Sequence, residues 1–199
     1  MPGLYTPPDY DLAGFIVGTV DEGHVLGPER VRADDAVIGL ASNGLHTNGY
    51  SLARRIIADR LHISVHDRFP GTQESVADVL LKTHRSYFQA LRPVLGDIHA
   101  MAHITGGGLP GNVPRVLPKT LDAVLDASTW AIPHEFAVLA EAGGVDRSEM
   151  FRAFNMGVGM VVIAAPAASG RVLASARSAG VDAWLLGQVV RGEGRAVLN

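Results

Sequence analysis

Three short glycine-rich polar stretches hold the residues of this chain that are best suited to chemistry. Their sequences are SNGLHTNG at 42–49, HITGGG at 103–108 and NMGVG at 155–159. Glycine lets backbone amides approach a ligand closely and adopts positive φ, and amides at a helix start attract anions. Histidine, asparagine and threonine add hydrogen-bond donors and a titratable base. We therefore expect the three stretches to bind a phosphate-bearing substrate together.

The first stretch places His46 between two asparagine-glycine pairs. This histidine could act as a general base, or it could hydrogen-bond a phosphate or a carbonyl group. Asparagine-glycine pairs are also ordinary turn signals, and Thr47 or Asn48 could simply cap a helix that begins at Tyr50. The residue types alone leave the functional and the structural interpretation open.

The second stretch is the more specific one, because three consecutive glycines exceed what a turn needs. Each glycine costs roughly 0.5–1 kcal/mol relative to alanine in ordered structure. The surplus at Gly106, Gly107 and Gly108 predicts that something passes close to the backbone, although a flexible turn is the simpler alternative. The lysine-serine/threonine pair of a Walker loop is absent, and the spacing differs from the dinucleotide fingerprint. In the third stretch, Asn155 is either a turn residue or a carboxamide aimed at the same site.

Other candidate residues carry weaker signals. His62 and His66 are four residues apart, which would suit a metal on a helix, but they fall in a predicted loop and are interpreted as surface residues. His99 is assigned to packing, and the pair Asp34-Asp35 to a solvated turn. We therefore predict no metal site in this chain.

Composition limits the classes of protein to consider. The chain has 199 residues, 47% of them hydrophobic, which is enough for one sizeable core. A formal charge of −3 gives no indication of nucleic-acid binding. Because cysteine is absent, disulfides, thiolate zinc sites and cysteine nucleophiles are excluded. The first residues do not resemble a signal peptide, and the apolar run 158–165 is too short to span a bilayer. We expect a globular cytoplasmic protein that does not bind a membrane.

Alternating element types predict a single α/β domain over residues 1–199. Apolar and β-branched runs predict strands at 10–20, 36–41, 98–104, 121–125, 158–165, 183–190 and 195–198. Helical spacing and proline or glycine punctuation predict helices at 50–61, 76–81, 83–95, 110–117, 133–142, 146–153 and 166–180. Asp146 with Glu149 indicates a capping box, and the last two strands are predicted to join across residues 192–194 as a hairpin.

Taken together, these motifs resemble the C-terminal half of the phosphoribosylformylglycinamidine cyclo-ligase (aminoimidazole ribonucleotide, or AIR, synthetase) family. The likeness runs from end to end of the chain. Its segments are MPGLY at 1–5, DYDLAGF at 9–15, HTNGYSL at 46–52, HITGGG at 103–108, NVPRVLP at 112–118, MFRAFN at 150–155 and GVGM at 157–160.

The resemblance implies a fold and a reaction. The fold would be a three-layer α-β-α domain with a mixed sheet and partly ferredoxin-like topology. The reaction is ring closure of formylglycinamidine ribonucleotide to aminoimidazole ribonucleotide in purine synthesis, with ATP and Mg²⁺. Either catalytic candidate, His46 or His103, would move a proton. The substrate-binding residues implied are Asn48, Thr105, Gly106, Gly107, Gly108, Asn155 and Gly157.

The same resemblance implies that a part of the enzyme is absent from this chain. In the family, a preceding N-terminal domain supplies the ATP loop, the metal-binding aspartates and much of a homodimer contact. We therefore expect this chain to be inactive alone. The alternative is a non-catalytic module that binds a phosphate ligand or another subunit. One departure stands out: Lys82-Thr83-His84 replaces an expected pattern of small residue, proline and threonine.

Overall fold

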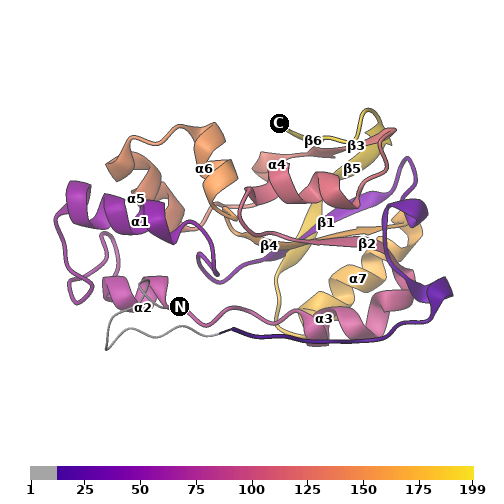
Figure 1. Ribbon diagram of the computed structural model, residues 1–199, viewed down its shortest axis with the longest axis horizontal. Helices are drawn as coiled ribbons and strands as arrows, with labels where there is room; N and C mark the ends of the chain where they lie inside the picture. Colours follow the sequence, from indigo (N-terminus) through magenta and orange to yellow (C-terminus); the bar gives the residue numbers. More distant parts are fainter. Residues whose placement is uncertain (1–12) are drawn as a thin grey trace.

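The computed structural model describes residues 13–199, and its centre is a mixed six-stranded sheet (Figure 1). The strand order is β2-β4-β1-β5-β3-β6. All neighbouring pairs are antiparallel except β3 and β6, which are parallel. The strands are β1 (Ala36–Ala41), β2 (Ile98–His103), β3 (Leu121–Leu125), β4 (Val158–Ala164), β5 (Ala183–Arg191) and β6 (Ala196–Leu198).

Helical segments occupy both sides of this sheet and one end of the molecule. The α-helices are α1 (Tyr50–Ile56), α2 (Val76–Leu80), α3 (Phe88–Leu91), α4 (Gly108–Asn112), α5 (His134–Gly143), α6 (Arg147–Ala153) and α7 (Pro166–Ser178). A π-helical turn, η3 (Ile57–Leu61), continues α1. Short 3₁₀ turns are η1 (Glu22–His24), η2 (Pro28–Arg30), η4 (Arg92–Asp97), η5 (Val113–Val116) and η6 (Ala127–Thr129). Within the described chain, no helix has the length and apolar character needed to cross a bilayer.

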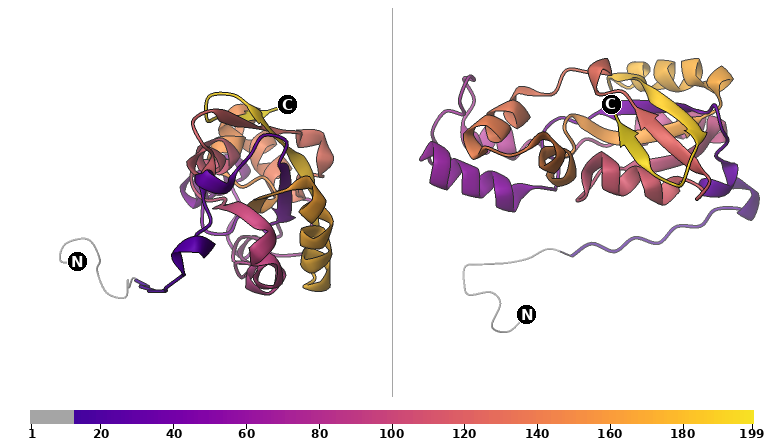
Figure 2. Two further views of the ribbon diagram at one scale, coloured as in Figure 1. Left: turned by 90° about the vertical axis from the view of Figure 1, so that its right-hand side faces the viewer. Right: turned by 90° about the horizontal axis from the view of Figure 1, so that it is seen from above.

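Two apolar cores lie on opposite faces of the sheet, which confirms the predicted α/β class with helices on both sides (Figures 1 and 2). On one face Ile38 of β1 packs in the core that includes Val172 of α7. On the other face Val37 packs in the core that includes Leu109 of α4. Adjacent residues of β1 enter different cores because successive side chains of a strand point to opposite faces.

The direction of the strands determines where the glycine-rich stretches fall. Both β1 and β2 are antiparallel to β4, which lies between them. They therefore run in the same direction, and their C-terminal ends lie next to the start of β4. This end of the three strands, where the chain enters or leaves the sheet, is called the shared edge. The register shows this directly: Ala41 pairs with Val158, and His103 pairs with Met160. The stretches at 42–49 and 103–108 leave this edge, and the stretch at 155–159 enters it.

One predicted strand is wrong, and one predicted helix is too long. Residues 13–20 form no strand, and Phe15 and Ile16 are 95% and 94% exposed, so they contact no core. Residues 1–12, which carry the rest of that prediction, the family motif at 1–5 and most of the motif at 9–15, lie outside the described part. The predicted helix over 83–95 begins only at Phe88, because tertiary hydrogen bonds hold residues 83–87 in an extended path.

The predicted hairpin between the last two strands is also wrong, because β3 lies between β5 and β6. The Asp122 side chain of β3 explains this placement. Its Oδ1 accepts hydrogen bonds from the backbone amides of Glu193 and Arg195, at 2.8 and 2.7 Å. These bonds hold the connecting segment over β3, so that β6 pairs with the far side of that strand.

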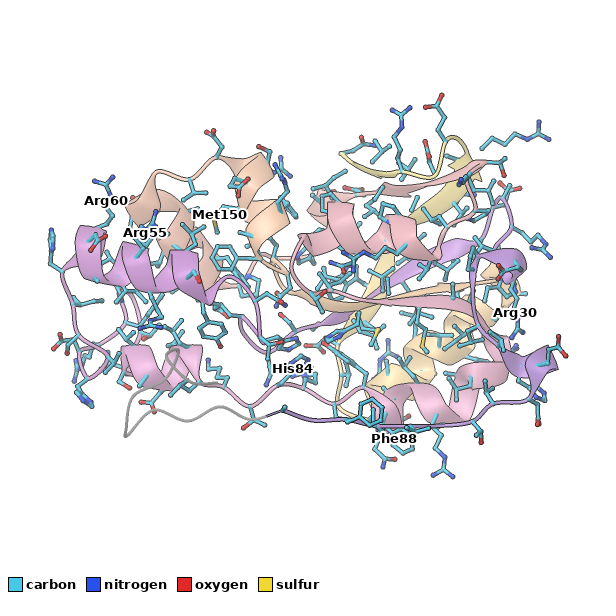
Figure 3. The ribbon with its side chains drawn as sticks, in the orientation of Figure 1. Arg30, Arg55, Arg60, His84, Phe88 and Met150 are labelled. Carbon is cyan, nitrogen blue, oxygen red and sulfur yellow. The ribbon has the colours of Figure 1, made fainter. Side chains whose placement is uncertain are left out.

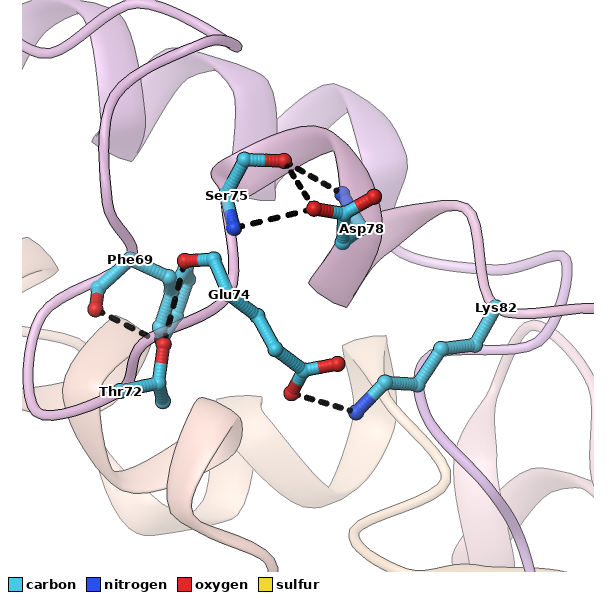
Figure 4. Close-up of polar contacts among 6 residues, drawn as sticks. All are labelled: Phe69, Thr72, Glu74, Ser75, Asp78 and Lys82. Carbon is cyan, nitrogen blue, oxygen red and sulfur yellow. Dashed lines mark hydrogen bonds and ion pairs between the residues drawn. The ribbon is translucent and has the colours of Figure 1, made fainter.

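Helix capping differs from the prediction as well. Asp146 is the N-cap of α6, but its side chain makes no capping hydrogen bond. The complete capping box occurs instead at α2, where Ser75 and Asp78 exchange side-chain and backbone hydrogen bonds (Figure 4). Next to it, the Lys82 ammonium group pairs with the Glu74 carboxylate at 3.2 Å. These contacts fix the point from which the extended segment 82–87 departs.

Candidate functional site

The three glycine-rich stretches meet at the shared edge of β1, β2 and β4, as expected. The Ser42 amide donates to the Gly157 carbonyl at 2.9 Å, which joins the first stretch to the third. The Ile104 amide donates to the Gly159 carbonyl at 3.0 Å, which joins the second to the third. The three stretches, which we expect to bind a substrate together, therefore lie side by side.

Asn155 braces this junction from within. It is fully buried, and its Oδ1 accepts hydrogen bonds from the Ser42 hydroxyl at 2.9 Å and the Gly157 amide at 2.8 Å. Its Nδ2 donates to the Gly44 carbonyl at 2.9 Å. With its amide engaged in this way, Asn155 positions the first and third stretches relative to each other.

The triple glycine is explained mainly by the packing of α6. A Cβ on Gly108 would lie 1.8 Å from the Phe151 carbonyl oxygen, and the Gly107 amide donates to the Arg152 carbonyl at 3.1 Å. The group that approaches this backbone closely is therefore a neighbouring helix. Gly106 differs, because it is exposed and a Cβ there would come no nearer than 4.0 Å to Asn48 Oδ1.

Asn112 holds the triple-glycine loop in shape. Its buried Nδ2 donates to the carbonyl of Gly108 at 2.8 Å and reaches those of Thr105 and Gly106 at 3.2 and 3.3 Å. Its Oδ1 accepts from the Thr105 hydroxyl at 3.0 Å. The hydroxyl of Thr105 therefore retains only acceptor capacity toward a ligand.

Asn48 and Gly157 have opposite surroundings. The Nδ2 of Asn48 is buried and has no hydrogen-bond partner among the described residues, so it is a donor available to a ligand beside Gly106. Gly157 has a φ of +96°, and a Cβ there would lie 2.6 Å from Pro133. Packing against Pro133 therefore accounts for the glycine at 157.

His46, His84 and His103 form a compact histidine cluster beside the glycine-rich stretches. His46 is only 4% exposed, and its ring stacks on that of His84 with centroids 4.0 Å apart. The Nε2 atoms of His84 and His103 are 3.2 Å apart. Sequence reasoning selected the first and last of these histidines but missed His84. The signal that could have found it is the departure from the family pattern at 82–84.

Hydrogen bonds identify the tautomer of His46. Asn43 Nδ2 donates to the Thr83 carbonyl at 2.7 Å, so its Oδ1 faces His46 Nε2 at 2.8 Å. His46 Nε2 therefore carries the proton. The backbone amide of Asn43 also points at this nitrogen, but at 3.3 Å it makes the weaker contact. His46 Nδ1 is then an unprotonated nitrogen, buried and without a partner among the described residues.

The environment of the cluster keeps the imidazoles of His46 and His103 uncharged. Burial, followed by the nearby His84, His103 and Arg85, lowers the pKa of His46 from 6.5 to about 4. Burial and the adjacent His84 also lower the pKa of His103. A buried imidazole loses the hydration that favours its charged form. Near neutral pH these two side chains can therefore accept a proton or hydrogen bond but supply no positive charge.

The segment that carries His84 is tied at one end to the first glycine-rich stretch and at the other to the end of β1. At its start, Asn43 binds the Thr83 carbonyl. At its end, the buried Tyr87 hydroxyl donates to the Ala41 carbonyl at 2.9 Å, and burial raises the Tyr87 pKa. Figure 3 shows His84 between the helices at one end of the molecule and the sheet, with Phe88 farther along the chain at the start of α3.

A cavity of about 350 Å³ opens beside His84 and His103. Its lining is mostly apolar and comes from α3, η4, β2 and β4, and includes the side chains of Arg85 and Arg92. The cavity thus combines an apolar wall, two cationic side chains and two imidazoles, a set that suits an organic phosphate.

A pair formed by His99 and Asp35 corrects one prediction. Asp35 is 2% exposed and its Oδ2 lies 2.7 Å from His99 Nδ1, so Asp35 is not part of a solvated turn. The same oxygen accepts from the Arg32 amide at 2.8 Å. Because His99 is near the start of β2, this pair lies at the opposite end of the strand from His103 and stabilises the fold there.

The described residues do not fit a magnesium site. Mg²⁺ takes oxygen ligands, above all carboxylates. In the described part of the chain, the one group of three or more histidine, aspartate or glutamate side chains close enough to share an ion consists of the three clustered histidines. The exposed Gly106 backbone and the free Asn48 amide suit phosphate or carbonyl oxygens instead.

Comparisons with known proteins agree with this geometry. The sequence model of the family described as "AIR synthase related protein, C-terminal domain" matches residues 32–199. A phosphoribosylformylglycinamidine cyclo-ligase of Sorangium cellulosum is 44% identical over 194 residues, which cover 96% of this chain and 56% of the relative. The chain thus spans little more than half the length of this curated relative.

Solved structures show the same fold at lower identity. Thiamine-monophosphate kinase from Stenotrophomonas maltophilia aligns with a TM-score of 0.59 at 18% identity, over 90% of this chain and 54% of that one. The hydrogenase maturation protein HypE in complex with ATP aligns with a TM-score of 0.58 at 16% identity, over 87% of this chain and 49% of that one.

Proposed function

Because the chain belongs to the family of AIR synthase related C-terminal domains, we propose that it is the substrate-side domain of a phosphoribosylformylglycinamidine cyclo-ligase. One observation carries the proposal. Three motif stretches, far apart in the sequence, are hydrogen-bonded together at one sheet edge, directly beside two uncharged histidines. The 44% identical relative bears the name of this enzyme.

The proposed reaction closes the five-membered ring of aminoimidazole ribonucleotide. ATP activates the formyl oxygen of formylglycinamidine ribonucleotide, and the amidine nitrogen attacks the activated carbon, with loss of a proton, ADP and phosphate. His46 or His103 accepts that proton, since both are neutral and face the same site. The geometry leaves the choice between them open.

The remaining site residues divide into contacts and supports. We propose that the Asn48 Nδ2 and the Gly106 backbone amide bind substrate oxygens, since neither nitrogen has a hydrogen-bond partner among the described residues. Thr105 contributes an acceptor. Arg85 and Arg92 supply cations for the ribose phosphate at the adjacent cavity. Gly107, Gly108, Asn155, Gly157 and Asn112 maintain the backbone shape.

ATP and Mg²⁺ are proposed to be held mainly by a second domain. The described residues lack a carboxylate cluster for the metal. The Sorangium relative has additional chain that this sequence does not match. We propose that such a segment forms the ATP-binding half and most of a homodimer contact, and that this chain alone is inactive.

A second candidate function follows from the same partial coverage. The chain could bind its phosphate ligand, or another subunit, without catalysing a reaction. The test is to fuse the unmatched part of the Sorangium enzyme to this chain and assay formation of aminoimidazole ribonucleotide. Turnover by the fusion but not by either part supports the cyclo-ligase. A folded fusion that binds formylglycinamidine ribonucleotide without turnover favours the binding module.

A further inference from the structure

We propose that His46, His84 and His103 together bind one divalent transition-metal ion such as Zn²⁺, with water completing the coordination. The three side chains each offer a nitrogen, and these nitrogens all lie within 4.8 Å of one another. Imidazole is a preferred ligand of Zn²⁺, and three histidines with a water form a known kind of open zinc site. The ion would occupy the lone pairs that His46 or His103 uses as proton acceptor in the proposed reaction, so this role belongs to the chain when it is not turning over substrate.

The separation of two of the nitrogens already matches a metal site. Two imidazole nitrogens at about 2.0–2.1 Å from a tetrahedral Zn²⁺ are about 3.3 Å apart. The Nε2 atoms of His84 and His103 are separated by 3.2 Å. The present spacing of these two nitrogens therefore fits a shared ion.

The third proposed ligand atom is His46 Nδ1. His46 is only 4% exposed, yet its Nδ1 has no hydrogen-bond partner in the described chain. Its Nε2 is bound to Asn43 Oδ1, which leaves Nδ1 with a free lone pair. A second-sphere oxygen on one ring nitrogen and a metal on the other is the common arrangement of metal-bound histidine. An ion at Nδ1 would satisfy the buried nitrogen.

The His84 ring must turn for all three histidines to bind at once. It now stacks on His46 with an angle of 20° between the rings, so their nitrogens do not converge. His84 lies on the extended segment 82–87 and is only partly buried, so its ring has room to rotate. The ends of that segment are fixed by Thr83 and Tyr87, which keeps His84 within reach of the other two.

The test titrates the metal-free 199-residue chain with Co²⁺, a spectroscopic substitute for Zn²⁺. We expect one Co²⁺ per chain, with visible absorption typical of tetrahedral nitrogen coordination, and displacement by Zn²⁺. His84→Thr introduces the residue that the family pattern predicts and should weaken binding at least about tenfold, as should His103→Gln. Because neither side chain is buried, we expect both variants to fold, and circular dichroism checks this.

The matched control is His66→Gln, which removes an exposed histidine outside the cluster and should leave the affinity unchanged. Equal Co²⁺ affinity in His84→Thr and the unmodified chain would overturn the proposal. So would loss of binding in His66→Gln, or absence of stoichiometric binding. Because the assay uses neither ATP nor substrate, its outcome is independent of the proposed cyclo-ligase activity.

Discussion

Ser42 donates its hydroxyl proton to the side-chain oxygen of Asn155 at 2.9 Å, across a separation of 113 residues. This bond joins the segment after β1 to the segment before β4, inside the protein. The Asn155 side chain has three hydrogen-bond partners among the described residues, and all three bonds are buried. The shape of the site edge therefore depends on one carboxamide.

Asn155→Ala should lower the free energy of unfolding by roughly 3 kcal/mol, because it leaves buried donors and an acceptor unpaired. Ser42→Ala is the matched control and should cost only about 1 kcal/mol, since the Gly157 amide still binds Asn155. Urea unfolding followed by circular dichroism measures both. Equal losses in the two variants would show that Asn155 is not the centre of this network.

Gly108→Ala should lower the free energy of unfolding by more than about 2 kcal/mol, because the residue has positive φ and the new Cβ collides with the Phe151 carbonyl. Gly111→Ala is the control in the same helix, where a Cβ meets nothing within 4 Å. There alanine should stabilise by up to about 1 kcal/mol through its helix propensity. Thermal unfolding compares the two, and similar melting temperatures would contradict the packing account.

Stability should fall as the pH is lowered from about 6.5 toward 4, measured with a chelator present. The pKa of His46 is lowered to about 4 in the folded chain, against 6.5 in the reference state. Over that interval His46 binds a proton in the unfolded chain but stays neutral in the folded chain, so protonation favours unfolding. Above 6.5 the contribution is constant. In His46→Gln the slope of unfolding free energy against pH should be smaller in this interval. An unchanged slope would mean that His46 titrates normally.

Calorimetry of the isolated chain should detect weak or no binding of Mg²⁺-ATP. The reason is the absence of a carboxylate cluster in the described residues. The same chain should bind formylglycinamidine ribonucleotide, which supplies the positive control. Tight Mg²⁺-ATP binding by this chain alone would contradict the assignment of the nucleotide to a second domain.

His46→Ala in the active two-domain fusion should reduce turnover by at least about 100-fold if His46 accepts the proton. His66→Gln serves again as the control and should retain full turnover, because that side chain is exposed and distant in sequence from the site motifs. A near-normal rate in His46→Ala would leave His103 as the proton acceptor and give His46 a structural role.

Much of the architecture follows from local pattern. The continuous apolar runs of β1 and β4, and the helical spacing of α1, specify elements that depend little on distant partners. The gathering of the glycine-rich stretches was predictable too, because each stretch adjoins a buried strand.

What local pattern could not provide depends on long-range contacts. Helical spacing over 83–87 is overridden by the hydrogen bonds of Thr83 to Asn43 and of Tyr87 to Ala41. A glycine is needed at 108 because Phe151 of α6, more than forty residues farther along the chain, packs against it. Asp35 looks like a turn residue until β2 brings His99 beside it. In each case the deciding partner is remote in sequence.

The placement of β4 between β1 and β2 has a consequence for how the protein acquires its site. No part of the edge is complete until the chain has been synthesised beyond residue 164 and a very long loop has closed. Such distant pairings form slowly, because the loss of chain entropy precedes the contacts that compensate for it. A ligand bound at this edge would stabilise the pairing of β4 with both neighbours, and amide hydrogen exchange in the three strands would slow together.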